Sequence, residues 1–125
     1  MLQLSKYLGE DVEAWFTGVE EDFALKEKAA VFGTAQQAVL HGIGIAPETI
    51  FNIHQVHGAQ VVNLSSAVQQ SGWAEIPDAD GAITVSPEVV LAVRTADCLP
   101  VFLYAASRRC IGLVHAGWKS TQAGI

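Results

Sequence analysis

Hydrophobic and polar positions follow two different patterns along this chain, and the change falls near Pro47. Across residues 23–42, apolar side chains recur at steps of three and four, which predicts an amphipathic helix with Gly42 just after its end. Beyond Pro47, short runs rich in valine, isoleucine and leucine are separated by turn-like stretches, which is typical of strands. The predicted strands are 49–53, 60–64, 82–85, 89–94, 100–104 and 110–114, and residues 65–80 are expected to form a loop.

This order of elements predicts an α/β (α+β) fold of layered mixed sheets with helices, in a single domain over residues 1–125. Half of the residues are hydrophobic and only 16% are charged, against about 25% in an average globular domain. The residues from Gly117 to Thr121 look like the start of a helix, with Ser120 or Thr121 as N-cap, and few residues follow. We therefore expect an incomplete fold that self-associates or pairs with a partner chain.

The charge pattern excludes several classes of function. Thirteen acidic and seven basic residues give a net charge of −6, whereas binding to nucleic acid or to an anionic membrane requires clustered Lys and Arg. No apolar run approaches the roughly 20 residues of a membrane span, and the N-terminus lacks the pattern of a signal peptide. We expect a cytoplasmic protein that binds neither nucleic acid nor membrane, with Cys98 and Cys110 as free thiols.

Three segments place reactive side chains where predicted strands end, which is where α/β enzymes commonly build their sites. They are HQVHG, TADCLP and HAGWKS, and they carry His57, Cys98 and His115 respectively. Imidazole and thiolate ligands together favour zinc or copper. Three protein ligands with one open position are the usual form of a catalytic zinc site. The sequence therefore predicts a metal site at these three residues.

The residues alone leave other interpretations open. A cysteine near a histidine is also a nucleophile and base pair, as in hydrolases, and Asp97 could orient the histidine. A lone cysteine is most often a packed small hydrophobe, which we expect of Cys110. For His54 we expect a side chain that points away from the site.

Four segments, in this order, resemble the YfiH-like family, whose members are described as multicopper polyphenol oxidases, laccase-domain proteins and purine nucleoside phosphorylases. They are QVHG at 55–58, DGAIT at 80–84, LAVRTADCLPV at 91–101 and HAGW at 115–118. The resemblance runs from about residue 50 to the end of the chain.

The resemblance implies a YfiH-like fold and a metal-dependent enzyme. Its metal, zinc in most accounts and copper for an oxidase, maps onto His57, Cys98 and His115. The implied activity is phosphorolysis of adenosine and inosine, with adenosine deamination as a side activity, so the partners would be a purine nucleoside and phosphate. The catalytic residues we predict are His57, Asp97, Cys98 and His115. The predicted substrate contacts are Gln55, Arg94, Trp118 and Lys119.

Three alternatives accompany this prediction: a copper-dependent polyphenol oxidase (laccase), a metal-free Cys/His hydrolase, and a degenerate metal-binding fragment without turnover. The chain departs from the family pattern in length and at Lys119 and Ser120, where members usually have Arg-Gly. Lysine keeps the charge of arginine but not its bidentate fork. We therefore expect a C-terminally truncated member in which the metal ligands are retained and the substrate contacts differ.

Overall fold

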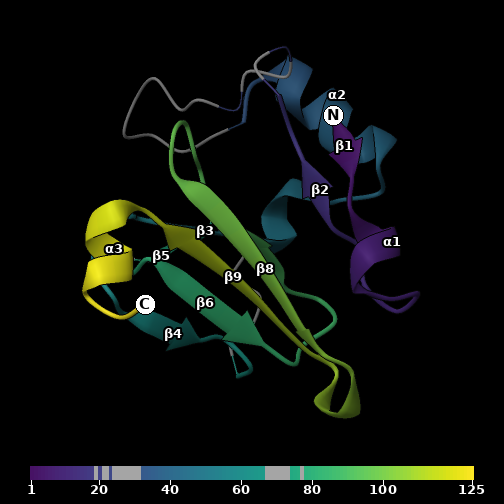
Figure 1. Cartoon of the computed structure of the whole chain (residues 1–125). Coiled ribbons are helices and arrows are strands. Elements are labelled where there is room, and N and C mark those ends of the chain that lie inside the picture. The colour runs from purple at the N-terminus through teal and green to yellow at the C-terminus, as the bar shows by residue number, and fades with distance from the viewer. Residues whose placement is uncertain (19, 21–22, 24–31, 67–73, 77) are drawn as a thin grey trace. The chain divides into compact units, whose positions relative to one another are not determined.

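The computed structural model describes residues 1–18, 20, 23, 32–66, 74–76 and 78–125 (Figure 1). The chain divides into two compact units, Met1–Pro47 and Glu48–Ile125, which we describe separately. The single domain expected from the sequence stays a prediction. Among the described residues, no helix has the length and apolar character needed to span a membrane.

The N-terminal unit consists of short elements. Its strands β1 (Leu2–Gln3) and β2 (Trp15–Phe16) pair antiparallel, and its helices are α1 (Ser5–Leu8) and α2 (Thr34–Gly42). The helix predicted at 23–42 was wrong at its start: Gly33 is extended and precedes α2 as its N-cap. The N–H of Gly33 donates to Oε1 of Gln36 at 2.7 Å, and this hydrogen bond caps the N-terminus of α2. Residues 24–31 of that prediction lie outside the described residues.

The C-terminal unit contains two sheets. The first is parallel, with the order β5–β3–β7, and its strands are β3 (Ile50–Ile53), β5 (Ala74–Ile76) and β7 (Val90–Ala92). The second has the order β4–β6–β9–β8, and its strands are β4 (Val61–Asn63), β6 (Gly81–Thr84), β8 (Leu99–Ala105) and β9 (Cys110–Ala116). Only β4 and β6 pair parallel in it. The short helices are η2 (Pro47–Thr49), η3 (Ala106–Arg108) and α3 (Trp118–Gln122).

The layered mixed α/β fold predicted from the sequence is confirmed, and so are the six predicted strands, within two residues at every end. Two local predictions were wrong. Strand β5 lies in the segment expected to be a loop. It was not predicted because it is only three residues long and depends on pairing with β3, a tertiary contact that the local sequence does not indicate. The last helix begins at Trp118, and its N-cap is Gly117 rather than Ser120 or Thr121 as predicted.

The core of the C-terminal unit lies between its two sheets. Ile53 of β3 and Ala82 of β6 are both fully buried, together with Ala79. Val62 and Leu91, from β4 and β7, pack against them. Because these residues come from both sheets, sheet packs on sheet, and the strand ends that carry the candidate site are held on a common scaffold.

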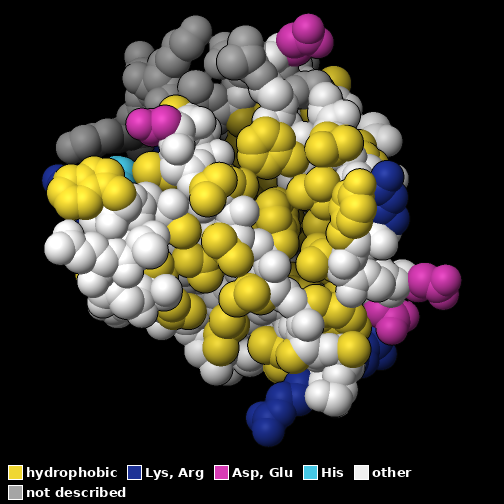
Figure 2. All heavy atoms as spheres, in the orientation of Figure 1, with side chains coloured by type: hydrophobic (Ala, Val, Ile, Leu, Met, Phe, Trp, Pro, Cys, Tyr) yellow, Lys and Arg dark blue, Asp and Glu magenta, His cyan; other side chains and the backbone are white. Residues whose placement is uncertain are grey.

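The other face of the four-stranded sheet is apolar and exposed. Val101 and Leu103 of β8 are 36% and 52% exposed, and Val61 of β4 is 44% exposed. The register aligns Val101 with Val114 of β9, so both point to this face. Figure 2 shows hydrophobic side chains gathered over these strands. A contiguous patch of this kind is typical of a surface that other protein covers.

Candidate metal centre

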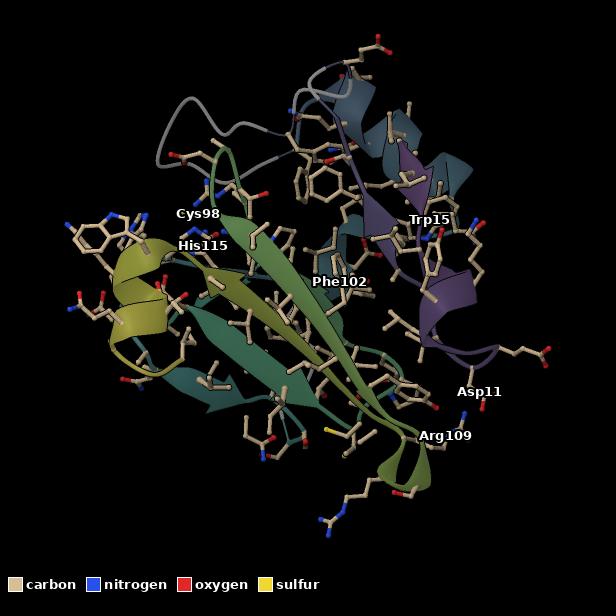
Figure 3. All side chains as sticks on the ribbon, viewed as in Figure 1. Asp11, Trp15, Cys98, Phe102, Arg109 and His115 are labelled. Atoms are coloured by element: carbon tan, nitrogen blue, oxygen red, sulfur yellow. The ribbon has the colours of Figure 1, made fainter. Side chains whose placement is uncertain are left out.

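Strand register brings three distant parts of the chain to one end of the four-stranded sheet. Leu99 at the start of β8 pairs with Ala116 at the end of β9, so Cys98 and His115 meet there, as Figure 3 shows. Gly81 at the start of β6 pairs with Val114, so Asp80 lies beside His115. The segment that carries His57 follows β3 of the other sheet.

The three predicted metal ligands form one cluster. The ligand atoms of His57, Cys98 and His115 all lie within 4.8 Å of one another. The two imidazole rings meet edge to face, with their centroids 4.9 Å apart. His115 is 3% exposed, Cys98 is half-buried with a free thiol, and His57 is exposed, so the cluster opens towards solvent on one side.

The carboxylate of Asp80 contacts both histidine segments. It accepts hydrogen bonds from the backbone N–H groups of Val56, His57 and Gly58 at 3.2, 2.9 and 2.7 Å. Its Oδ1 also lies 2.9 Å from Nδ1 of His115. Burial alone would raise the pKa of Asp80, but the bond to His115 and the three backbone bonds together hold that pKa below its usual value. Three backbone N–H groups donate to this carboxylate, so it acts as the acceptor here and Nδ1 of His115 is assigned as a further donor.

Gly117 leaves the space that the ligands occupy. A Cβ atom built on this residue would lie 2.9 Å from Sγ of Cys98 and 3.3 Å from Cδ2 of His57. Its φ of −83° and ψ of 170° are open to any residue, so contact with the ligands is what favours glycine here.

The three ligand residues, with Asp80 bonded to His115, fit a metal ion such as zinc. Bonds of about 2.0–2.3 Å in tetrahedral geometry place ligand atoms roughly 3.3–3.8 Å apart. The ligand atoms here lie within 4.8 Å of one another without a metal ion. A ligating histidine usually donates its other ring N–H to a carboxylate, and His115 does so to Asp80. The two imidazoles and one thiolate are donors that both zinc and copper accept.

A pocket of about 290 Å³ lies over the cluster, and three of the five other predicted site residues line it. Gln55, Arg94 and Asp97 line it together with the three ligands. The side-chain amide of Gln55 donates to the carbonyl of Arg94 at 2.6 Å and accepts from the N–H of Arg94 at 2.7 Å. Both ends of this amide are therefore committed to the backbone of Arg94. Trp118 and Lys119 are not among the lining residues.

Trp118 and Lys119 follow the site along the chain and lie on α3. The indole of Trp118 is 74% exposed, and Nζ of Lys119 lies 5.6 Å from its ring centroid. His54, expected to point away, has its Nδ1 3.6 Å from Oδ1 of Asp78, and both side chains are largely exposed. Asp80 and Gly117 were not predicted as site residues, although they stand inside the segments DGAIT and HAGW.

Comparisons with known proteins agree on one group. The model of a family described as multi-copper polyphenol oxidoreductase laccase matches residues 10–125. A purine nucleoside phosphorylase of Rickettsia conorii is 40% identical over 78 residues, which are 62% of this chain and 30% of that protein. One of Deinococcus radiodurans is 40% identical over 83 residues, 66% of this chain and 30% of that protein.

Two solved structures share the fold. YlmD from Geobacillus stearothermophilus has a TM-score of 0.64 at 28% identity, over 73% of this chain and 35% of that chain. YfiH from Bacillus licheniformis has a TM-score of 0.60 at 28% identity, over 73% of this chain and 36% of that chain. This chain thus spans about a third of the length of the relatives it matches.

Proposed function

We propose a metal-dependent function for this chain, which belongs to the multi-copper polyphenol oxidoreductase laccase family. The YfiH-like motifs of the sequence predicted this membership. The proposed site holds one zinc ion at His57, Cys98 and His115. The function we propose is phosphorolysis of purine nucleosides such as adenosine and inosine. The observation that carries the proposal is the convergence of these three ligand atoms, with Gly117 leaving room for them.

The proposed substrates rest on the relatives, which are named purine nucleoside phosphorylases. The pocket volume of about 290 Å³ is near the lower end of the range of pockets that bind small molecules, which suits a small substrate. Adenosine deamination is a proposed side activity. We also propose a cytoplasmic location, because the two free cysteines suit a reducing compartment.

The proposed roles follow from what each side chain can reach. In phosphorolysis a phosphate oxygen bonds to the anomeric carbon while the bond from that carbon to the purine nitrogen breaks, and the purine takes up a proton. Arg94 lines the pocket and its backbone is held by Gln55, which supports phosphate binding as the proposed role of its guanidinium. Asp97 is exposed in the pocket and is the proposed general acid/base, which would pass the proton released by the attacking phosphate to the purine. A bound zinc ion would supply a Lewis acid for a substrate oxygen.

The first test is metal content. Elemental analysis of the purified chain should find close to one zinc per chain, and His57→Ala or Cys98→Ala should remove it. Two matched controls are available: His54→Ala, an exposed histidine outside the cluster, and Cys110→Ala, at the opposite end of β9 from His115. Both controls should keep the zinc. A wild-type chain without metal, whose Cys98 reacts readily with thiol reagents, would instead favour a metal-free Cys/His hydrolase.

The second candidate function is copper-dependent oxidation of phenols. The ligand set itself favours it, because two histidines and one cysteine also form the sites of blue-copper proteins. Visible absorption separates the two functions, since a copper–thiolate bond is coloured and a zinc–thiolate bond is not. Copper at the cluster with phenol oxidation would replace the zinc proposal.

A further inference from the structure

Asp80 is a buried carboxylate at the centre of the candidate metal centre. It is 0% exposed and immediately precedes β6. Its Oδ1 accepts from Nδ1–H of His115 and from the backbone N–H of His57, both at 2.9 Å. Its backbone carbonyl accepts from the N–H of His115 at 2.7 Å. One residue therefore joins both histidines of the cluster.

We propose that Asp80 is the positioning residue that fixes both histidines for the metal, one through its ring and the other through its backbone. The inference rests on the proposed zinc site and deepens it. Asp80 itself is not a ligand, because its oxygens are taken up by four hydrogen bonds from residues 56–58 and His115.

The bond to His115 decides which ring nitrogen is free. Because Nδ1 carries the proton that it donates to Asp80, the lone pair of a neutral ring lies on Nε2. Nε2 is then the atom available to a metal ion. Without the carboxylate, the ring can change tautomer and rotate, so fewer molecules present the Nε2 lone pair of His115 to the metal ion.

The backbone bonds hold His57 in an uncommon conformation. Its φ is 58°, in the left-handed region that non-glycine residues seldom occupy. Three successive N–H groups, from Val56 to Gly58, point at the same carboxylate, which is how backbone turns bind anions. The negative charge of Asp80 therefore stabilises the turn that aims the His57 ring at Cys98.

The test replaces the carboxylate by an amide of the same shape. Asp80→Asn keeps one acceptor oxygen and loses the charge, so we expect zinc affinity to fall about 10- to 100-fold. The matched control is Asp78→Asn, which removes an exposed carboxylate two residues away and should bind zinc like the wild type. Affinity is measured by competition with a chromophoric chelator, and circular dichroism checks that both variants are folded.

A second measurement needs no variant. In the metal-free wild type, at a pH where the His115 ring is neutral, its nitrogen-15 shifts should report the ring proton on Nδ1. The opposite tautomer overturns the inference, even if Asp80→Asn fails to fold. Equal zinc affinity in a folded Asp80→Asn variant and in the wild type also overturns it, while the zinc site stands. A wild-type chain that binds no zinc refutes the proposed function, and this inference with it.

Discussion

Gly117→Ala tests the geometry of the proposed metal centre with a single methyl group. Carbon contacts are most favourable at about 3.5–4.0 Å, whereas the new Cβ would lie 2.9 Å from Sγ of Cys98. The overlap is therefore roughly 0.6–1.1 Å on that measure. The backbone at Gly117 already has φ and ψ values that alanine adopts, so the methyl alone causes the effect.

The size of the effect depends on whether the metal is bound. In the metal-free chain, the half-buried side chain of Cys98 can rotate away, so the variant should lose little stability. With zinc bound, the sulfur must stay within about 0.2 Å of its bonding position. The overlap then has to be absorbed by strain, which costs about 1–3 kcal/mol in packed sites. That range corresponds to a loss of zinc affinity of about 5- to 150-fold.

Competition with a chromophoric chelator measures the affinity, and thermal unfolding of the metal-free protein measures the stability. The matched control is Gly42→Ala, where an added Cβ meets no atom within 4 Å, so zinc affinity should not change. A folded Gly117→Ala variant that binds zinc as tightly as the wild type would show that the three ligands do not close on a metal in this arrangement.

Three further predictions follow from single contacts. Ser120→Ala should raise the free energy of unfolding by about 1 kcal/mol in thermal melts, because Oγ of Ser120 is buried and has no hydrogen-bond partner among the described residues; a lower melting temperature would contradict this. Gln55→Ala should lower the free energy of unfolding by about 1–3 kcal/mol, since the backbone N–H and carbonyl of Arg94 lose their partners. An unchanged melting temperature would show that these two hydrogen bonds do not stabilise the fold. Leu103→Glu should weaken concentration-dependent self-association in sedimentation velocity, since Leu103 is 52% exposed on the apolar face; equal association by variant and wild type would exclude this face.

The sequence predicts those features of the fold that depend on neighbours along the chain. The strands of the C-terminal unit could be read from their valine and isoleucine runs, because side-chain pattern and strand pairing agree there. Strand β5 and the start of α2 could not. The first depends on pairing with β3, and the second on how Gly33 caps the helix through Gln36. Both are decided by contacts that a hydrophobic pattern does not encode.

The same distinction explains the site. Its ligands could be proposed from the sequence because each stands in a short motif whose residue types limit the chemistry. The group that orients them could not, since the bond from His115 to Asp80 spans 35 positions and exists only through the register of β6 on β9. Asp97 was the natural choice for that role because it adjoins Cys98. The structure puts it on the exposed wall of the pocket, and the carboxylate at His115 is that of Asp80.

This difference between the two carboxylates has a consequence for engineering the site. We expect substitutions at Asp97 to leave the ligands in place, because in the described part of the chain this exposed residue makes no hydrogen bond to either histidine of the cluster. Asp80 cannot, because the backbone of His57 and the ring of His115 share one of its oxygens. Substitutions at Asp97 should therefore act on turnover and those at Asp80 on metal affinity. The two kinds of measurement separate catalysis from assembly of the centre.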